Sequence, residues 1–88
     1  MDKNDFTFIR KDEEYDDYWF RVHGTTKEEL TDKYMEMCMI EVNEVVYSKK
    51  EDIVGVKCLF PFNYDVITPL DAELKETLIS LIEDVKVG

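Results

Sequence analysis

The spacing of the apolar residues changes along this chain, and that change restricts the fold more than any other feature. Residues 6–10 alternate, with Phe6 and Phe8 on one side, and residues 18–23 alternate again. Such a period of two is typical of half-buried β-strands. The run between them, Asp12 to Asp17, contains five carboxylates in six residues and belongs in a solvated turn. We therefore expect an antiparallel hairpin with an acidic tip.

Two later segments carry the wider spacing of an amphipathic helix. The first should begin at Thr25, where Thr25/Glu28 and Thr26/Glu29 fit a capping box, and run to about Tyr47 or Lys49. The second should begin with Thr68 as N-cap and Pro69 at the first helical position. Their expected core stripes comprise Leu30, Tyr34, Met35, Cys38, Met39, Val42, Val45 and Val46, and then Leu70, Leu74, Leu78, Leu81, Ile82 and Val85.

One further segment, Ile53 to Phe60, is β-branched or apolar at nearly every position and predicts a well-covered strand that Pro61 ends. Residues 62–67 fit either a short edge strand or an ordered loop. The expected fold class is α+β: a small antiparallel-rich sheet of three or four strands covered by two helices, in the order β-β-α-β-(β)-α. Residues 1–88 should form a single acidic domain.

The charge balance excludes several classes of partner. Twenty-one Asp and Glu against eleven Lys and Arg give a net charge of -10. Direct binding to nucleic acid or to an anionic membrane is disfavoured, because both need basic side chains. Neither a signal peptide nor a membrane-spanning run is evident, and Cys38 and Cys58 lie in apolar stretches typical of reduced thiols. We expect a cytoplasmic protein, in the host cytoplasm if a phage encodes it.

Few residues of the sequence are placed to form a catalytic or a metal-binding site. His23 is the only histidine, and neither cysteine is placed like an exposed thiolate. The Asp12–Asp17 run lacks the spacing and the glycine of a calcium loop. We therefore expect no enzyme, no metal and no cofactor.

The placement of the carboxylates predicts a partner-binding surface. The hairpin mixes carboxylates with aromatic residues, and the polar arc of the first helix holds carboxylates together with two large apolar side chains. Solvation alone is the alternative for each helix face, and Trp19 is as well suited to packing under the sheet as to an interface. The candidate residues are Asp12, Glu13, Glu14, Tyr15, Asp16, Asp17, Trp19, Glu29, Asp32, Glu36, Ile40, Glu44 and Tyr47.

These features favour a small acidic inhibitor or adaptor that occupies the basic, nucleic-acid-binding face of a partner protein, with carboxylates standing where phosphates would. Phage-encoded anti-CRISPR and anti-restriction proteins, and immunity proteins of nuclease toxins, share this size and charge. The alternative is a homo-oligomeric module, such as a homodimer, that uses Met37, Ile40 and Tyr47 on a self-complementary helix face.

Overall fold

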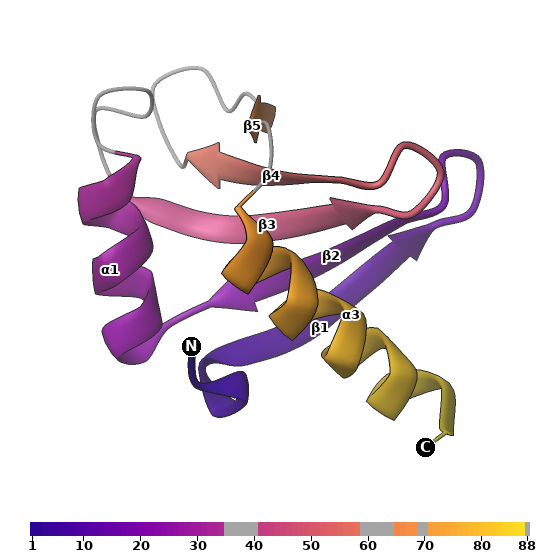
Figure 1. The fold of residues 1–88 in the computed structure, drawn as a ribbon, viewed down its shortest axis with the longest axis horizontal. Coiled ribbons are helices and arrows are strands. Elements are labelled where there is room, and N and C mark those ends of the chain that lie inside the picture. Colours follow the sequence, from indigo (N-terminus) through magenta and orange to yellow (C-terminus); the bar gives the residue numbers. More distant parts are fainter. Residues whose placement is uncertain (35–40, 59–64, 69–70, 88) are drawn as a thin grey trace.

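The fold is known from a computed structural model, which describes residues 1–34, 41–58, 65–68 and 71–87. It has a short 3-10 turn, five strands and two α-helices (Figure 1). In chain order these are η1 (Lys3–Asp5), β1 (Phe6–Asp12), β2 (Asp17–Val22), α1 (Gly24–Lys33), β3 (Val42–Ser48), β4 (Ile53–Cys58), β5 (Asp65–Thr68) and α3 (Ala72–Val87).

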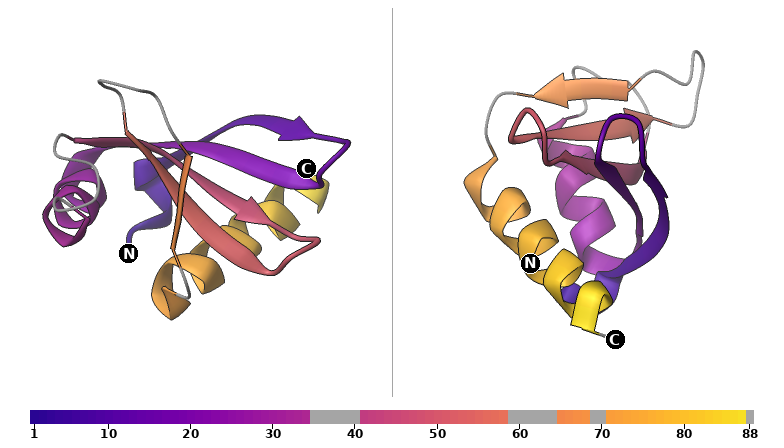
Figure 2. Two further views of the ribbon diagram at one scale, coloured as in Figure 1. Left: turned by 90° about the horizontal axis from the view of Figure 1, so that it is seen from above. Right: turned by 90° about the vertical axis from the view of Figure 1, so that its right-hand side faces the viewer.

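The strands form one antiparallel sheet in the sequential order β1-β2-β3-β4-β5. Both helices lie on the same side of this curved sheet, and no described helix or strand covers its other side (Figure 2). We call these two sides the inner and the outer face. The α+β class, the antiparallel sheet and the two covering helices are confirmed.

The core lies between the inner face and the helices. Phe20, Val45 and Val56 project from β2, β3 and β4, and Leu30 and Leu74 project from the two helices; all are 1% exposed or less. Burial of each such side chain stabilises the fold by about 1.5–3 kcal/mol relative to exposure. The expected burial is confirmed for Leu30, Tyr34, Val42, Val54, Val56, Leu74, Leu78 and Ile82. The expected core position of Val85 is wrong, because its side chain is 43% exposed near the end of α3.

The prediction of one long helix reaching Tyr47 or Lys49 is wrong. α1 ends at Lys33, and the chain re-enters the sheet as β3, between β2 and β4. Val42, Val45 and Val46 fit a helical stripe by spacing, but β-branched side chains pack better on a pleated surface. A strand in this place also gives β2 and β4 a hydrogen-bonding partner. Because of β3 the sheet has one strand more than the expected maximum.

Helix starts also differ from the predicted ones. At α1 no capping box forms; Asp5 Oδ2, from η1, accepts a hydrogen bond from the backbone N–H of Thr26 at 3.1 Å. Gly24 has a φ of +65°, and a Cβ there would lie 2.6 Å from Asp5 Oδ1. At α3 the cap is Asp71, whose Oδ1 accepts from the N–H of Leu74 at 3.1 Å, whereas Thr68 ends β5.

The segment left open between strand and loop contains an edge strand, β5, paired with β4. The predicted strand over Ile53 to Phe60 is confirmed as β4 up to Cys58. The core placement expected for the side chains of Cys38 and Cys58, like that of Met35, Met39 and Leu70, lies outside the described residues.

Candidate partner-binding surface

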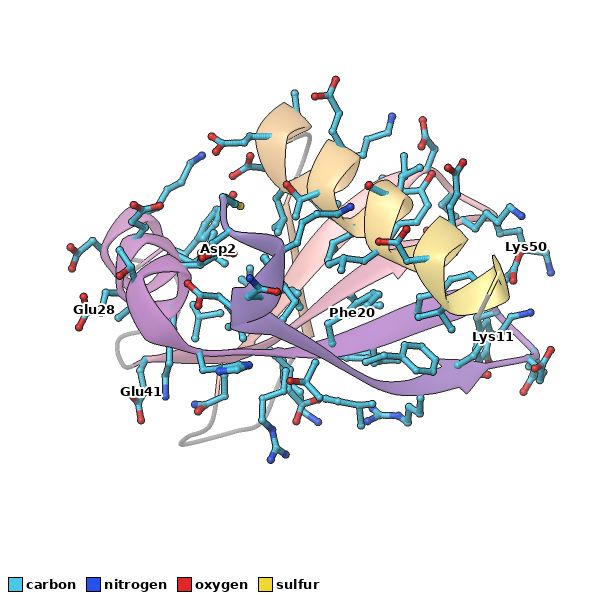
Figure 3. The ribbon with its side chains drawn as sticks, turned by 90° about the horizontal axis from the view of Figure 1, so that it is seen from below. Asp2, Lys11, Phe20, Glu28, Glu41 and Lys50 are labelled. Atoms are coloured by element: carbon cyan, nitrogen blue, oxygen red, sulfur yellow. The ribbon has the colours of Figure 1, made fainter. Side chains whose placement is uncertain are left out.

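The predicted partner-binding residues of the hairpin turn and those of α1 lie at opposite ends of the molecule. Figure 1 shows α1 at one end and the β1–β2 and β3–β4 turns at the other, and Figure 3 shows Glu28 near the first end and Lys11 and Lys50 near the second. The candidates over Asp12–Asp17 belong to the turn end, and Glu29 and Asp32 to the exposed side of α1. The hairpin and helix candidates therefore do not form one patch.

Two candidates from the supposed long helix lie on a strand instead. Glu44 and Tyr47 lie on β3 and point to opposite sides of the sheet. Glu36 and Ile40 lie outside the described residues, as does Met37 of the alternative oligomer face.

Tyr47 belongs to the inner face and is 7% exposed. Its hydroxyl donates a hydrogen bond of 2.6 Å to Asp52 Oδ1, and Lys75 Nζ lies 2.7 Å from Asp52 Oδ2. Burial, and then the hydrogen bond to Asp52, raise the pKa of Tyr47 to about 12. Lys75 and then Tyr47 hold the pKa of the Asp52 carboxyl below its usual value. Tyr47 thus ties β3 to α3, and its expected position on a polar helix arc is wrong.

Trp19 lies on the outer face, yet it is only 6% exposed. Arg10 Cζ lies 4.6 Å from the centroid of its ring, and Lys57 Nζ lies 5.6 Å from it. Both distances suit cation–π contact. The aliphatic stems of such side chains cover apolar surface while their charges reach solvent. Trp19 therefore packs on the sheet face opposite α1 and α3, under cations of its own chain.

A row of alternating charge crosses the outer face beside Trp19. Arg21, Glu44 and Lys57 are cross-strand partners in succession. Arg10 Nη1 approaches Glu44 Oε1 to 3.8 Å. Opposite charges at such positions stabilise a sheet. Glu44 therefore has a structural role that its predicted place on a helix did not suggest.

The two turns at the far end lie side by side. The backbone N–H of Lys49 donates to the carbonyl of Asp16 at 3.1 Å, and Lys11 Nζ lies 3.3 Å from Glu13 Oε2 and 3.4 Å from Asp16 Oδ1. The hydrogen bond with Glu13 raises the pKa of Lys11. Part of the acidic run is thus neutralised within the hairpin, whereas Glu14 is exposed and forms no ion pair with any described residue.

Next to these turns the outer face contains a small hollow, which we call the tip pocket. Its volume is about 110 Å³. It is lined by Tyr15, Asp17, Trp19, Val46, Ser48, Lys50, Glu51 and Ile53. Sequence analysis found Tyr15, Asp17 and Trp19 but missed the residues of the β3–β4 turn, because that turn was assigned to the end of a helix.

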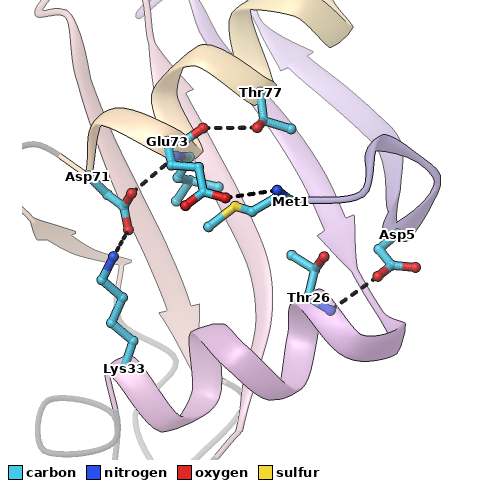
Figure 4. A network of polar contacts seen from close by, with 8 residues as sticks. Met1, Asp5, Thr26, Lys33, Asp71, Glu73 and Thr77 are labelled. Carbon is cyan, nitrogen blue, oxygen red and sulfur yellow. Dashed lines mark hydrogen bonds and ion pairs between the residues drawn. The ribbon is translucent and has the colours of Figure 1, made fainter.

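Sequence analysis also missed Asp71, which is 6% exposed. Its Oδ2 accepts from Lys33 Nζ at 2.6 Å and from the hydroxyl of Tyr34 at 2.9 Å, which joins the end of α1 to the start of α3 (Figure 4). Burial alone raises the pKa of Asp71, but the hydrogen bonds from Lys33, Leu74 and Tyr34 outweigh it and hold the pKa below its usual value. An Asp three residues before a buried Leu was the available signal for this cap.

Catalytic groups do not gather around the histidine. His23 is exposed at the start of α1, with Nε2 3.1 Å from the hydroxyl of Thr7. In the described part of the chain, no three His, Cys, Asp or Glu side chains are grouped so that they could hold a metal ion. Nor is any helix there both long enough and apolar enough to cross a bilayer.

No protein-family model, curated protein or solved structure matches this chain.

Proposed function

We propose that this protein is a small acidic inhibitor or adaptor, not an enzyme, that occupies the basic, nucleic-acid-binding face of a partner protein. One observation carries the proposal. At the turn end, the structure brings together carboxylates without a cationic partner, the exposed ring of Tyr15 and a hollow. Tyr15 is 56% exposed, and neither Glu14 nor Asp17 forms an ion pair with another described residue.

The distribution of ion pairs supports the same proposal. Many cations of the chain are already held by its own carboxylates, namely Lys3, Arg10, Lys11, Lys27, Lys33 and Lys75. On α1 the exposed Glu28, Glu29 and Asp32 have no such partner among the described residues. The excess negative charge thus faces solvent, where it accelerates encounter with a basic surface.

In this arrangement α1 supplies long-range attraction and the turn end supplies the contact. Carboxylates standing where phosphates bind would exclude DNA or RNA from the partner. Such a role suits a phage protein directed against host defence, of the anti-CRISPR or anti-restriction kind, or an immunity protein. Either would act in a reducing cytoplasm.

The test begins with affinity capture from the native host and identification of the partner by mass spectrometry. The purified partner is then loaded with labelled DNA or RNA and titrated with this protein. We expect the nucleic acid to be released, and unlabelled nucleic acid in excess to reverse the release. Recovery of this chain alone would favour the homo-oligomeric alternative, and a partner that keeps its nucleic acid would contradict the proposal.

Two double variants locate the contact, because each removes two carboxylate charges. E14Q/D17N alters the turn end, and E28Q/D32N alters α1 at the opposite end. We expect the first to accelerate dissociation of the complex, and the second to lower only the association rate, by an amount that added salt also removes. A faster dissociation from the α1 variant alone would move the contact to α1.

A further inference from the structure

Asp17 lines the tip pocket, and its carboxylate has an oxygen without a hydrogen-bond partner among the described residues. Asp17 Oδ1 is buried, and it accepts no hydrogen bond from any described residue. Burial of an acceptor without a partner costs about 1–3 kcal/mol, and more when the acceptor is charged. Buried polar groups in folded proteins are generally paired, so this one calls for an explanation.

Asp17 also lies opposite a like charge. Its cross-strand partner on β1 is Asp12, and its partner on β3 is Ser48. Carboxylates directly opposite each other on neighbouring strands destabilise a sheet. Asp12 Oδ1 accepts a hydrogen bond from the backbone N–H of Glu14 at 3.1 Å. No cation of the described chain pairs with Asp12 or Asp17, so the repulsion between these two charges is uncompensated. A cation placed in the pocket would relieve both costs.

The pocket walls suit a flat cation. Tyr15 offers an exposed aromatic ring, and Trp19 and Ile53 supply apolar surface. One water needs about 10–15 Å³ of such space, so a volume of about 110 Å³ leaves room for a larger group. The same sheet face already holds a guanidinium group against an aromatic ring, since Arg10 lies over Trp19.

From these observations we infer that the tip pocket receives an arginine side chain of the basic partner. The inference rests on the proposed function and names the chemistry of its contact. Guanidinium is planar, so it can stack on Tyr15 while donating in-plane hydrogen bonds to Asp17, whereas the compact ammonium of lysine is suited to only one of these contacts at a time. The charge of Asp17 thereby gains a cationic partner only in the complex.

Lys50 lines the pocket with the same sign of charge as the arginine. Its side chain is exposed and forms no ion pair with Asp17 within the described part of the chain. The charge of Lys50 therefore repels the arginine, but the Lys50 side chain does not take the arginine's place as the partner of Asp17. Removal of its charge should strengthen binding, whereas removal of the charge of Asp17 should weaken it.

The only tryptophan of the chain lines the pocket, so its fluorescence reports on changes at this site. We would titrate the free protein with N-acetyl-arginine amide and, separately, with N-acetyl-citrulline amide, which has nearly the same shape but no charge. The indole N–H resonance of Trp19 would be followed by NMR in parallel. We expect a saturable change with the arginine compound and none with the citrulline compound. Equal responses to both, or no saturable response to arginine, would overturn the inference.

Three single variants sharpen the test. D17N should weaken arginine binding roughly tenfold or more, because it removes a charge-assisted acceptor and keeps its shape. K50Q should strengthen binding, and E76Q, at an exposed position of α3 that does not line the pocket, should leave it unchanged. D17N should also unfold at a higher temperature than the parent, since it removes the repulsion with Asp12, and that result shows that the variant is folded. Equal weakening by D17N and E76Q would show that the effect depends only on net charge, and would overturn the inference.

The titration with arginine compounds tests the further inference, and the nucleic-acid release from the captured partner tests the proposed function, so their outcomes are distinguishable. Release of nucleic acid by this protein, without arginine binding in the tip pocket, would overturn the inference and leave the proposed function intact. Arginine binding in the pocket, with a captured partner that keeps its nucleic acid, would support the inference and contradict the proposed function.

Discussion

Single residues in this protein connect elements that are distant in the sequence. Asp71 joins α1 to α3 through Lys33 and Tyr34 while it caps α3. Tyr47 and Asp52 join the sheet to Lys75 of α3. Asp71 and Tyr47 are buried, whereas Lys33 and Asp52 are exposed. A hydrogen bond to a buried charged group such as Asp71 is worth about 1.5–3 kcal/mol.

We predict that Asp71→Asn lowers the free energy of unfolding by about 1.5–3 kcal/mol at pH 7. The folded pKa of Asp71 lies below its unfolded value of about 3.9, so its contribution is present above that value and is lost as the pH falls through the folded pKa. The parent and the variant should therefore converge in strong acid. Urea unfolding across this pH range measures the difference. Asp84→Asn is the control; that exposed carboxylate pairs with Lys3 at 3.2 Å and should contribute about 0.5 kcal/mol or less.

Tyr47→Phe should respond at the opposite end of the pH scale. The folded pKa of Tyr47, about 12, lies above its unfolded value of about 10. Its contribution is therefore complete below about pH 10 and is lost as the pH rises toward 12. We expect the variant to be less stable than the parent at neutral pH and the gap to close above about pH 10, as measured by urea unfolding. A gap that stays constant through this range would contradict the hydrogen bond to Asp52.

Elements in this fold are held by contacts from outside their own sequence. α1 begins where Asp5 of η1 satisfies a free backbone amide, and the close approach of Asp5 to Gly24 leaves no space for a side chain. β3 exists because β2 and β4 lie on either side of it. Local sequence signals are weaker than these tertiary contacts.

The capping of α1 is tested by two alanine variants. Asp5→Ala should destabilise the protein by about 1 kcal/mol, the usual loss for a helix cap. Thr25→Ala, at the position that the capping-box pattern indicates, should change stability far less, because Thr25 is exposed and caps nothing. Amide hydrogen exchange at Thr26 should accelerate only in Asp5→Ala. Equal effects of the two variants on stability would indicate that the local capping box, and not Asp5 alone, caps α1.

At the scale of the whole molecule, the net charge of -10 opposes compaction, since many carboxylates lie on the surface of a body about 35 × 27 × 21 Å. Repulsion over such distances depends on ionic strength, because the Debye length falls from about 30 Å at 0.01 M to about 8 Å at 0.15 M. Folding and partner binding should therefore respond to salt in opposite directions.

We predict that the Tm of the free protein rises by a few degrees between about 0.01 M and 0.15 M NaCl, as screening relieves self-repulsion. Calorimetry or circular dichroism at fixed pH measures the shift. E28Q/D32N, with two charges fewer, should start from a higher Tm at low salt and gain less from added salt. A Tm that falls with salt in both proteins would show that the internal ion pairs outweigh the surface repulsion.

The sequence by itself determined the fold class, the hairpin with its charged turn and most of the core. The alternation at Phe6, Phe20 and Val22 predicts only a strand, because a period of two buries one face, and these three side chains are buried. The four-residue spacing of Leu74, Leu78 and Ile82 likewise predicts only a helix, and these side chains are buried.

Only the tertiary structure decided the rest. Val42, Val45 and Val46 fit a helix and a strand equally well by spacing, and the places beside β2 and β4 selected the strand. With β3 in the sheet, Glu44 and Tyr47 turned to opposite faces and the β3–β4 turn came to lie beside the β1–β2 turn. The tip pocket is formed by both turns, so no local pattern in either one could have predicted it. Spacing records which side chains share a face, whereas the neighbours that cover that face are fixed by contacts distant in the sequence.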